Sequence, residues 1–187
     1  MLAATAHLAD LKYDVFETAL GWVAVVASKQ GVRQTRLPEP SPEEARSAAG
    51  LSGGSSPALH GPAALKSVRD LIIRYCAGEP VDLSGVQVDM SGWPEFFQRA
   101  RRACRGIPPG ETRTYAWLAG EAGSPRAARG AGQAMARNPV PLLVPCHRVV
   151  GSDGGLHGFG GSVGLPLKQR LLNMESAAWS SRQIVRA

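Results

Sequence analysis

The pattern of apolar, Gly and Pro residues changes near residue 91, and this change constrains the fold of the chain of 187 residues more than any other feature. Before it, residues 13–37 alternate apolar and polar side chains, which predicts strands joined by tight turns. Residues 66–76 carry apolar side chains at helical spacing, and residues 81–90 return to strand-like alternation. The first half of the chain therefore predicts a small α/β unit.

The second half predicts several short helices, because Gly and Pro interrupt its apolar pattern. The first helix covers residues 94–105, and the second begins with Thr114 as its N-cap. The third begins with Ser124 as its N-cap and Pro125 in its first turn, and a last helix covers residues 166–175. Two short helices joined by a tight, Gly-containing link predict a helix-turn-helix.

We therefore expect an α+β chain with an N-terminal α/β domain over residues 1–90 and a C-terminal helix-turn-helix domain over residues 91–187. Since 44% of the residues are hydrophobic, a substantial core can form. No run reaches the roughly 18 apolar residues of a membrane span, and the N-terminus lacks the pattern of a secretion signal. These absences predict a cytoplasmic protein with no membrane partner.

The three cysteines are Cys76, Cys104 and Cys146, an odd number at wide spacing that fits neither a disulfide framework nor a zinc motif. Cys76 and Cys104 stand at helical spacing among apolar residues. We expect these two thiols to pack in the core as small hydrophobic side chains.

The net charge of +6 favours a polyanionic partner, although many basic proteins bind no nucleic acid. On the predicted third helix, Arg126, Arg129, Gln133 and Arg137 stand three or four residues apart and would share one face. Small residues fill the positions between them, so the backbone could approach a groove closely. A solvated surface helix explains the arginines equally well, and the small residues favour contact with DNA.

Cys146 is the candidate reactive residue, because His147 follows it directly. A free thiol has a pKa of about 8.5, so an adjacent base or imidazolium is needed to activate it at neutral pH. The prolines around residues 140–144 predict an extended segment, in which neighbouring side chains point apart. A turn or a bridging water would then connect thiol and imidazole, and Glu175 could fix the imidazole tautomer. The residues alone leave a hydrolase, a redox sensor and an inert buried cysteine open.

The segments around Cys146 resemble one protein family. Residues 138–141 (Asn-Pro-Val-Pro) and 145–149 (Pro-Cys-His-Arg-Val) are similar to the active-site motif of the O6-alkylguanine-DNA alkyltransferases, also called methylated-DNA-protein-cysteine methyltransferases. The resemblance is strong over about residues 93–175, and a weaker similarity extends to the predicted strands of residues 13–37. Further matching segments are residues 108–115, 124–129, 158–161 and 168–175.

The family resemblance implies a ribonuclease H-like N-terminal domain followed by a winged helix-turn-helix domain. It implies DNA repair by direct reversal, with irreversible, stoichiometric transfer of the alkyl group from O6-alkylguanine to Cys146 after base flipping. The implied partner is double-stranded DNA containing O6-alkylguanine, bound through its minor groove by a monomer. Action on O4-alkylthymine stays open.

The resemblance also implies a role for each matched residue. Cys146 would be the alkyl acceptor, His147 the base acting through water, and Glu175 the partner of His147. Asn138 would brace the active-site turn, and Tyr115 would donate a hydrogen bond toward the guanine. The implied DNA-binding residues are Arg126, Ala127, Ala128, Arg129, Ala131, Gln133 and Tyr115, with Arg129 filling the gap left by the flipped base. The implied pocket residues are Met135, Pro141, Val149, Phe159 and Gly160.

The sequence departs from the family pattern at two places. Phe159 stands where a tyrosine is common, so one hydroxyl contact is missing, and Ser162 and Val163 lengthen the loop that follows. The N-terminal cysteines and histidines that bind zinc in some relatives have no counterparts here, and His7 and His60 lie in segments without a clear pattern. We expect no metal and no cofactor.

Two alternative functions compete with alkyl transfer. A DNA lesion sensor of the alkyltransferase-like kind lacks the acceptor thiol, so Cys146 argues against it. A thiol hydrolase needs turnover and an oxyanion site, and the sequence offers no recognisable one.

Overall fold

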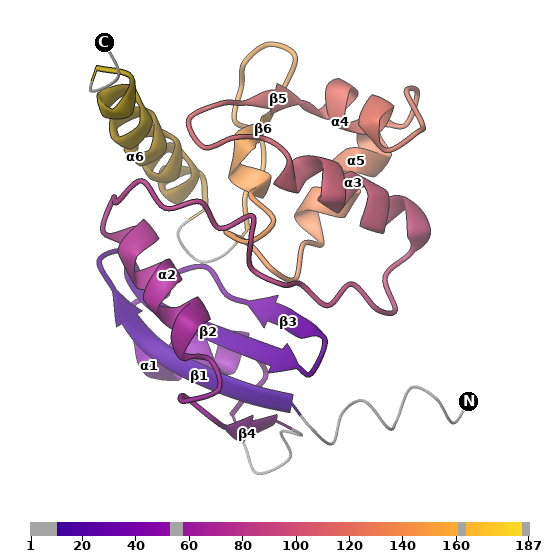
Figure 1. The fold of residues 1–187 in the computed structure, drawn as a ribbon. Helices are drawn as coiled ribbons and strands as arrows, with labels where there is room; N and C mark the ends of the chain where they lie inside the picture. The colour runs from indigo at the N-terminus through magenta and orange to yellow at the C-terminus, as the bar shows by residue number, and fades with distance from the viewer. Residues whose placement is uncertain (1–10, 53–57, 161–163, 185–187) are drawn as a thin grey trace.

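The computed structural model describes residues 11–52, 58–160 and 164–184. Figure 1 shows a sheet flanked by helices in the N-terminal half, and a largely helical C-terminal half beside it. The predicted α+β class, with the sheet first and the helices after it, is therefore confirmed.

The sheet of the first half has the strand order β3-β2-β1-β4. Strands β1, β2 and β3 are antiparallel neighbours, whereas β4 runs parallel to β1. The turns before β2 and β3 need glycine, because Gly21 and Gly31 have φ angles of 125° and 131°. The strands are β1 (Leu11–Thr18), β2 (Gly21–Ser28), β3 (Gly31–Thr35) and β4 (Ala58–His60).

Two helices cover opposite faces of this sheet (Figure 1). Helix α1 (Pro42–Ala48) places Ala45 against Ala24 of β2. Helix α2 (Lys66–Cys76) was predicted with these bounds, and it packs in the main core with the alternate β2 residues, such as Val23. Successive side chains of β2 point to opposite faces of the sheet, so each of the two helices packs against an apolar face.

Three short helices form the centre of the second half, namely α3 (Glu95–Arg105), α4 (Tyr115–Glu121) and α5 (Ala128–Ala136). The predicted N-cap of α4 is confirmed, because the hydroxyl of Thr114 accepts a hydrogen bond from the backbone N–H of Trp117 at 3.1 Å. Cys104 on α3 is fully buried, and so is Cys76 on α2. The expected core positions of both thiols are confirmed.

The predicted start of the third helix is wrong. Ser124 caps no helix, because its carbonyl accepts the backbone N–H of Ala127 in a separate turn. Helix α5 begins at Ala128, and Arg126 therefore lies in the turn before the helix. The cap-like sequence of Ser124 and Pro125 fits a turn as well as a helix start.

Residues 81–90 form no strand, although their pattern predicted one. Their backbone meets the sheet only around Val32, whose N–H donates to the carbonyl of Gln87 and whose carbonyl accepts from the N–H of Asp89. The alternation arises because Val86 and Val88 point into the core. Alternating burial therefore occurs here without a hydrogen-bonded ladder.

The predicted extended segment over residues 140–144 is also wrong, because the chain folds back on itself there. The N–H of Val144 donates to the carbonyl of Val140 at 2.9 Å, and Leu142 adopts a φ of 71°. Proline fixes its own φ but does not prevent such a turn at its neighbours. The result is a tight loop directly before Cys146.

The elements after this loop complete the second half. A short 3₁₀ turn η1 (Cys146–Arg148) leads into β6 (Val149–Val150), which pairs in parallel with β5 (Arg113–Thr114). Helix α6 (Gly164–Ile184) contains the predicted residues 166–175 and is longer at both ends.

Candidate active site

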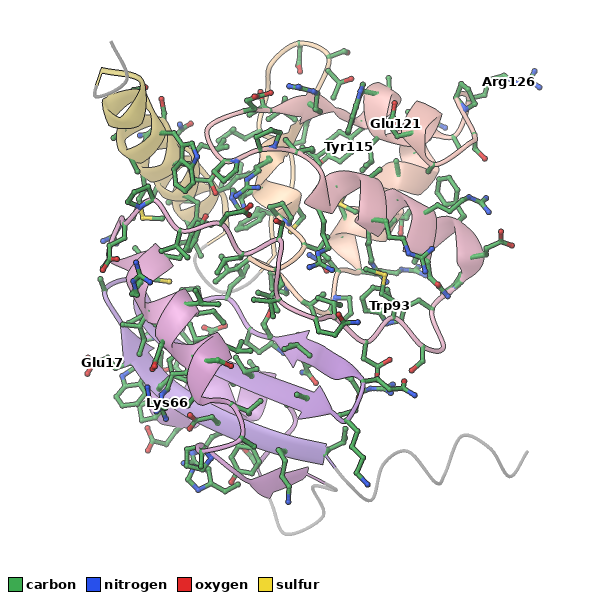
Figure 2. All side chains as sticks on the ribbon, viewed as in Figure 1. Glu17, Lys66, Trp93, Tyr115, Glu121 and Arg126 are labelled. Carbon is green, nitrogen blue, oxygen red and sulfur yellow. The ribbon has the colours of Figure 1, made fainter. Side chains whose placement is uncertain are left out.

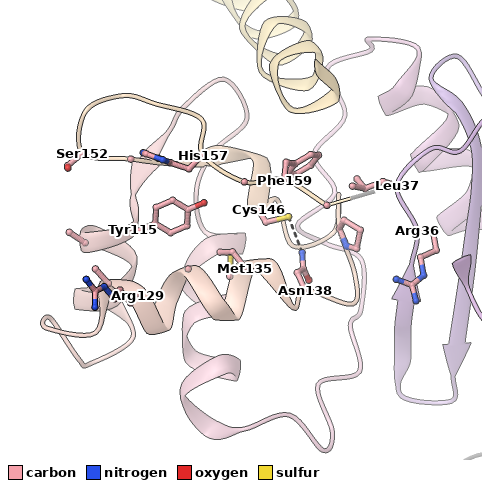
Figure 3. A pocket seen from close by; sticks show the side chains of 18 of the residues that line it. Arg36, Leu37, Tyr115, Arg129, Met135, Asn138, Cys146, Ser152, His157 and Phe159 are labelled. Atoms are coloured by element: carbon pink, nitrogen blue, oxygen red, sulfur yellow. Dashed lines mark hydrogen bonds between the residues drawn. The ribbon is translucent and has the colours of Figure 1, made fainter. Parts of the chain in front are cut away.

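A cleft with a volume of about 1230 Å³ opens between α5, the loop after β6 and the edge of the N-terminal sheet (Figure 3). Cys146 lies in it and is 8% exposed. Several residues predicted for the site line this cleft: Tyr115, Ala128, Arg129, Met135, Asn138, Pro141, Phe159 and Gly160.

Asn138 holds the loop that carries Cys146. Its Nδ2 donates to the carbonyl of Val144 at 2.8 Å and to Sγ of Cys146 at 3.4 Å. Its Oδ1 accepts the N–H of Val140 at 3.1 Å. One amide side chain therefore clamps both ends of the tight loop and also contacts the sulfur.

The thiol of Cys146 is in its neutral form near pH 7. Burial raises its pKa, and the hydrogen bond from Asn138 and the positive charges of Lys168 and Arg101 offset only part of this increase. The site therefore holds a buried neutral thiol, surrounded by groups that favour its anion. Such a thiol needs a base at the moment of reaction.

His147 follows Cys146 directly in the 3₁₀ turn, and its side chain is fully buried. Its Nε2 donates to Oε1 of Glu175 at 3.0 Å, whereas its buried Nδ1 has no hydrogen-bond partner within the described part of the chain. Burial lowers the pKa of His147, with Glu175 opposing that effect, so the ring is neutral near pH 7. A neutral ring with its proton on Nε2 presents a lone pair on Nδ1.

Glu175 receives hydrogen bonds from several sides. Arg148 donates from Nε and Nη2, the latter at 2.7 Å to Oε1, and the N–H of Gly110 donates to Oε2 at 3.2 Å. Burial by itself would raise the pKa of Glu175, but His147 and Arg148 outweigh it and hold that pKa well below the usual value. Glu175 is therefore a carboxylate at any working pH.

The rim of the cleft carries polar and basic side chains. Arg129 and Gln133 are exposed on α5, and Tyr115 directs its hydroxyl into the cleft on the side of Cys146 (Figure 3). Arg126 projects into solvent from the turn before α5 (Figure 2).

Comparisons with known proteins decide the family. Residues 95–177 match the model of the "6-O-methylguanine DNA methyltransferase, DNA binding domain". The chain is 42% identical to the methylated-DNA–protein-cysteine methyltransferase of Methanothermobacter thermautotrophicus over 128 residues, and this match covers 68% of each of the two chains. The chain belongs to the methylated-DNA–protein-cysteine methyltransferase family.

Other members of this family agree. The methyltransferase of Mycobacterium bovis is 41% identical over 116 residues, covering 62% of this chain and 68% of that protein. The crystal structure of Mycobacterium tuberculosis OGT in complex with DNA has a TM-score of 0.73 and 32% identity, and covers 89% of this chain and 94% of that one. The family resemblance drawn from the motifs is confirmed.

Two residues expected at the site of this methyltransferase lie elsewhere. The side chain of Val149 is fully buried beside the cleft rather than lining it. Ala131 is also fully buried, because it faces the core side of α5, so its side chain cannot contact DNA. Ala127 and Ala128 are half-buried, and only Ala128 borders the cleft.

No sequence pattern predicted that the first half of the methyltransferase contributes to the site. Arg36, Leu37 and Glu39, which follow β3 in the chain, form a wall of the cleft. Tyr75, which lies in the predicted helix α2, donates a hydrogen bond from its hydroxyl to Glu175 at 2.6 Å. Both contributions depend on how the two halves pack against each other, and local sequence patterns do not predict this packing.

The described residues hold no group of three or more His, Cys, Asp and Glu side chains that could bind a metal ion. His60 lies at the surface, with Nε2 at 3.6 Å from Oδ1 of Asp14. His7, Ser162 and Val163 lie outside the described residues. Among the helices of the described ranges, none is both long and apolar enough to cross a bilayer.

Proposed function

We propose that this chain repairs O6-alkylated guanine in DNA by moving the alkyl group onto Sγ of Cys146. Family membership makes it an O6-methylguanine-DNA methyltransferase that acts by direct reversal. The observation that carries the residue assignment is the neutral Cys146 thiol in the cleft, next in sequence to a neutral His147 whose Nδ1 has no partner among the described residues.

The proposed reaction is a displacement at the alkyl carbon. A water passes the proton of Cys146 to Nδ1 of His147, the S–C bond forms, and the C–O6 bond breaks. The electron pair of that bond leaves with guanine, which is a poor leaving group unless donors stabilise its charge. The hydroxyl of Tyr115 is the donor that the cleft offers. The thioether product resists water, so each molecule reacts once.

DNA binding is proposed for the exposed side of α5. Arg129 and Gln133 are exposed there, and the small residues of the helix allow a close approach to the minor groove. Arg129 lines the rim of the cleft, so it is placed to replace a base that has flipped toward Cys146. Arg126 would reach the phosphates from the preceding turn.

We also propose the division into domains at residues 90 and 91, because the sheet precedes this point and α3 begins just after it. A monomer suffices, since one chain supplies every residue assigned to the site. The cytoplasmic location stays a prediction, supported by the need to reach DNA.

The test is incubation of the protein with a duplex that contains one O6-methylguanine, followed by intact mass and peptide mapping. We expect one added methyl group, on Cys146, and no second turnover. Cys146→Ala should gain no methyl group, whereas Cys104→Ala, which removes a buried thiol outside the cleft, should still react. Turnover beyond one equivalent would favour a hydrolase, and tight binding without mass change would favour a lesion sensor.

A further inference from the structure

Helix α2 delivers one side chain of the first half into the catalytic cluster of the second half. Tyr75 stands in the last turn of α2 and is 1% exposed. Its hydroxyl donates to Oε1 of Glu175 at 2.6 Å, and the same oxygen lies 3.3 Å from Nε2 of His147. Figure 1 shows α2 beside the start of the chain that leads to α3, with α6 above it.

We propose that Tyr75 is a positioning residue for alkyl transfer, which tunes His147 by donating a hydrogen bond to the carboxylate that His147 also uses. The inference rests on the roles proposed above for Cys146 and His147, and it assigns a chemical task to the N-terminal half.

The direction of the Tyr75 hydrogen bond is fixed. Burial raises the pKa of Tyr75 well above its usual value, and the negative charge of Glu175 raises it further. The phenol therefore keeps its proton, and that proton points at Glu175 because a carboxylate can only accept. The phenol oxygen then turns a lone pair toward Nε2 of His147. Both neighbours of Nε2 are acceptors, which keeps the imidazole proton on Nε2 and leaves Nδ1 free to take the thiol proton.

Three donors share one oxygen of Glu175. Oε1 accepts hydrogen bonds from Tyr75 at 2.6 Å, from Arg148 at 2.7 Å and from His147 at 3.0 Å. Each donor reduces the negative charge density available to the others, as expected in a buried network. Removing the phenol proton donor leaves more of that charge facing His147, which makes the ring easier to protonate. The lost 3.3 Å contact to Nε2 acts in the opposite sense, but it is the longer and weaker of the two.

Other charged groups also act on His147, but substitution of Tyr75 leaves them in place. The groups that contact His147 or act on its charge are Tyr75 of α2, Glu175 and Lys168 of α6, and Arg148 of its own turn, while Cys146 precedes it in that turn. Arg148 and Lys168 lower the pKa of His147, whereas Glu175 raises it.

The experiment compares the pH dependence of Cys146 alkylation in wild type, Tyr75→Phe and Tyr13→Phe. Free O6-benzylguanine is the substrate, so that DNA binding does not enter, and intact mass reports one benzyl group per chain. Tyr13 is the matched control, because it also lies in the first half and its hydroxyl contacts Arg46 rather than the cluster. The acid limb of each profile reports protonation of the base.

Tyr75→Phe should move the acid limb to higher pH by about half a unit, which is about a threefold loss of rate below the midpoint. Tyr13→Phe should follow wild type. An acid limb of Tyr75→Phe that coincides with wild type overturns the proposal, and so does a slower reaction at every pH with no shift, since packing alone would produce it.

A second variant keeps the test decisive if Tyr75→Phe does not fold. Replacing Tyr75 alone with 3-fluorotyrosine keeps its shape and makes the phenol a stronger donor, so the acid limb should move to lower pH. No shift, or a shift to higher pH, overturns the role of Tyr75. Failure of wild type to gain a benzyl group on Cys146 would instead reject the proposed function itself.

Discussion

Arg129 and Cys146 occupy different parts of the same cleft, so their tasks can be separated by experiment. Cys146 is 8% exposed and held by Asn138, whereas Arg129 is exposed on the first turn of α5. A guanidinium at the rim can act on the DNA stack without touching the sulfur.

Arg129→Ala should therefore slow repair of O6-methylguanine in duplex DNA by at least about tenfold, the effect of losing one favourable contact of about 1.4 kcal/mol. Its reaction with free O6-benzylguanine should stay within about twofold of wild type, since no base has to leave a stack. Both rates are read from intact mass against time. Arg74→Ala, which removes an exposed arginine of α2, serves as the control for charge. Equal losses on the two substrates would remove the extrusion role.

At the scale of single residues, the sequence predicts those parts of the site that lie close together along the chain. Asn138, Cys146 and His147 lie within one stretch of ten residues, and a hydrogen bond joins Asn138 to Cys146. The protonation state of the thiol was not predictable, because it follows from burial by distant segments. Tyr75 was not predictable either, since its helical pattern is the same for a core tyrosine and for one that donates to Glu175.

At the scale of single elements, Arg101 of α3 caps the C-terminal end of α5. It is 2% exposed, and its guanidinium lies 4.2 Å from the ring centroid of Trp93. Nε donates to the carbonyl of Ala134 at 3.3 Å, and Nη2 donates to that of Arg137 at 2.5 Å. A cation at these carbonyls also matches the negative end of the helix dipole. Burial lowers the pKa of Arg101 to about 10, so it stays charged at neutral pH.

Arg101→Met should lower the free energy of unfolding by about 2 kcal/mol, because two carbonyls at the end of α5 lose a charged donor. The neighbour Arg102 is exposed and donates a hydrogen bond to Gln98 at the surface, so Arg102→Met should change stability by less than about 0.5 kcal/mol. Urea unfolding of both variants measures the difference. Equal midpoints for the two variants would show that the cap carries no stability.

Helix ends were predictable where one local hydrogen bond decides them. Thr114 caps α4 as its sequence indicates. The start of α5 was missed because Ser124 bonds through its carbonyl to a turn, and the true N-cap, Ala127, has no side-chain acceptor to announce it. The pattern of residues 81–90 misled in another way, since the alternation arose because Val86 and Val88 pack in the core, whereas only one bridge pairs this segment with β3.

At the scale of the whole molecule, Glu175 joins both halves through one buried carboxylate. It accepts from Tyr75 of the first half and from Arg148 and Gly110 of the second. It is 1% exposed. Such a group should make the two halves unfold together, and it should make their stability depend on pH.

The sign of that dependence follows from the lowered pKa of Glu175. The unfolded chain takes up a proton near the ordinary value of 4.5, whereas the folded chain resists protonation until a much lower pH. The stabilisation is thus complete above about pH 5 and is lost as pH falls from there toward the folded pKa. The variant Glu175→Gln lacks this pH-dependent stabilisation. It also leaves the buried positive charge of Arg148 without a carboxylate partner.

The free energy of unfolding of Glu175→Gln should therefore lie about 3 kcal/mol below wild type at pH 7. The gap should narrow as pH falls below about 4.5, because Glu175 of the unfolded wild-type chain then takes up a proton that the folded chain does not yet bind. Urea unfolding at a series of pH values measures it. Glu79→Gln, which breaks an exposed pair with Arg74, should differ from wild type by less than about 1 kcal/mol throughout. A gap for Glu175→Gln that stays constant down to pH 3, about 1.5 units below the ordinary pKa, would mean that the carboxylate acts through shape and not through charge.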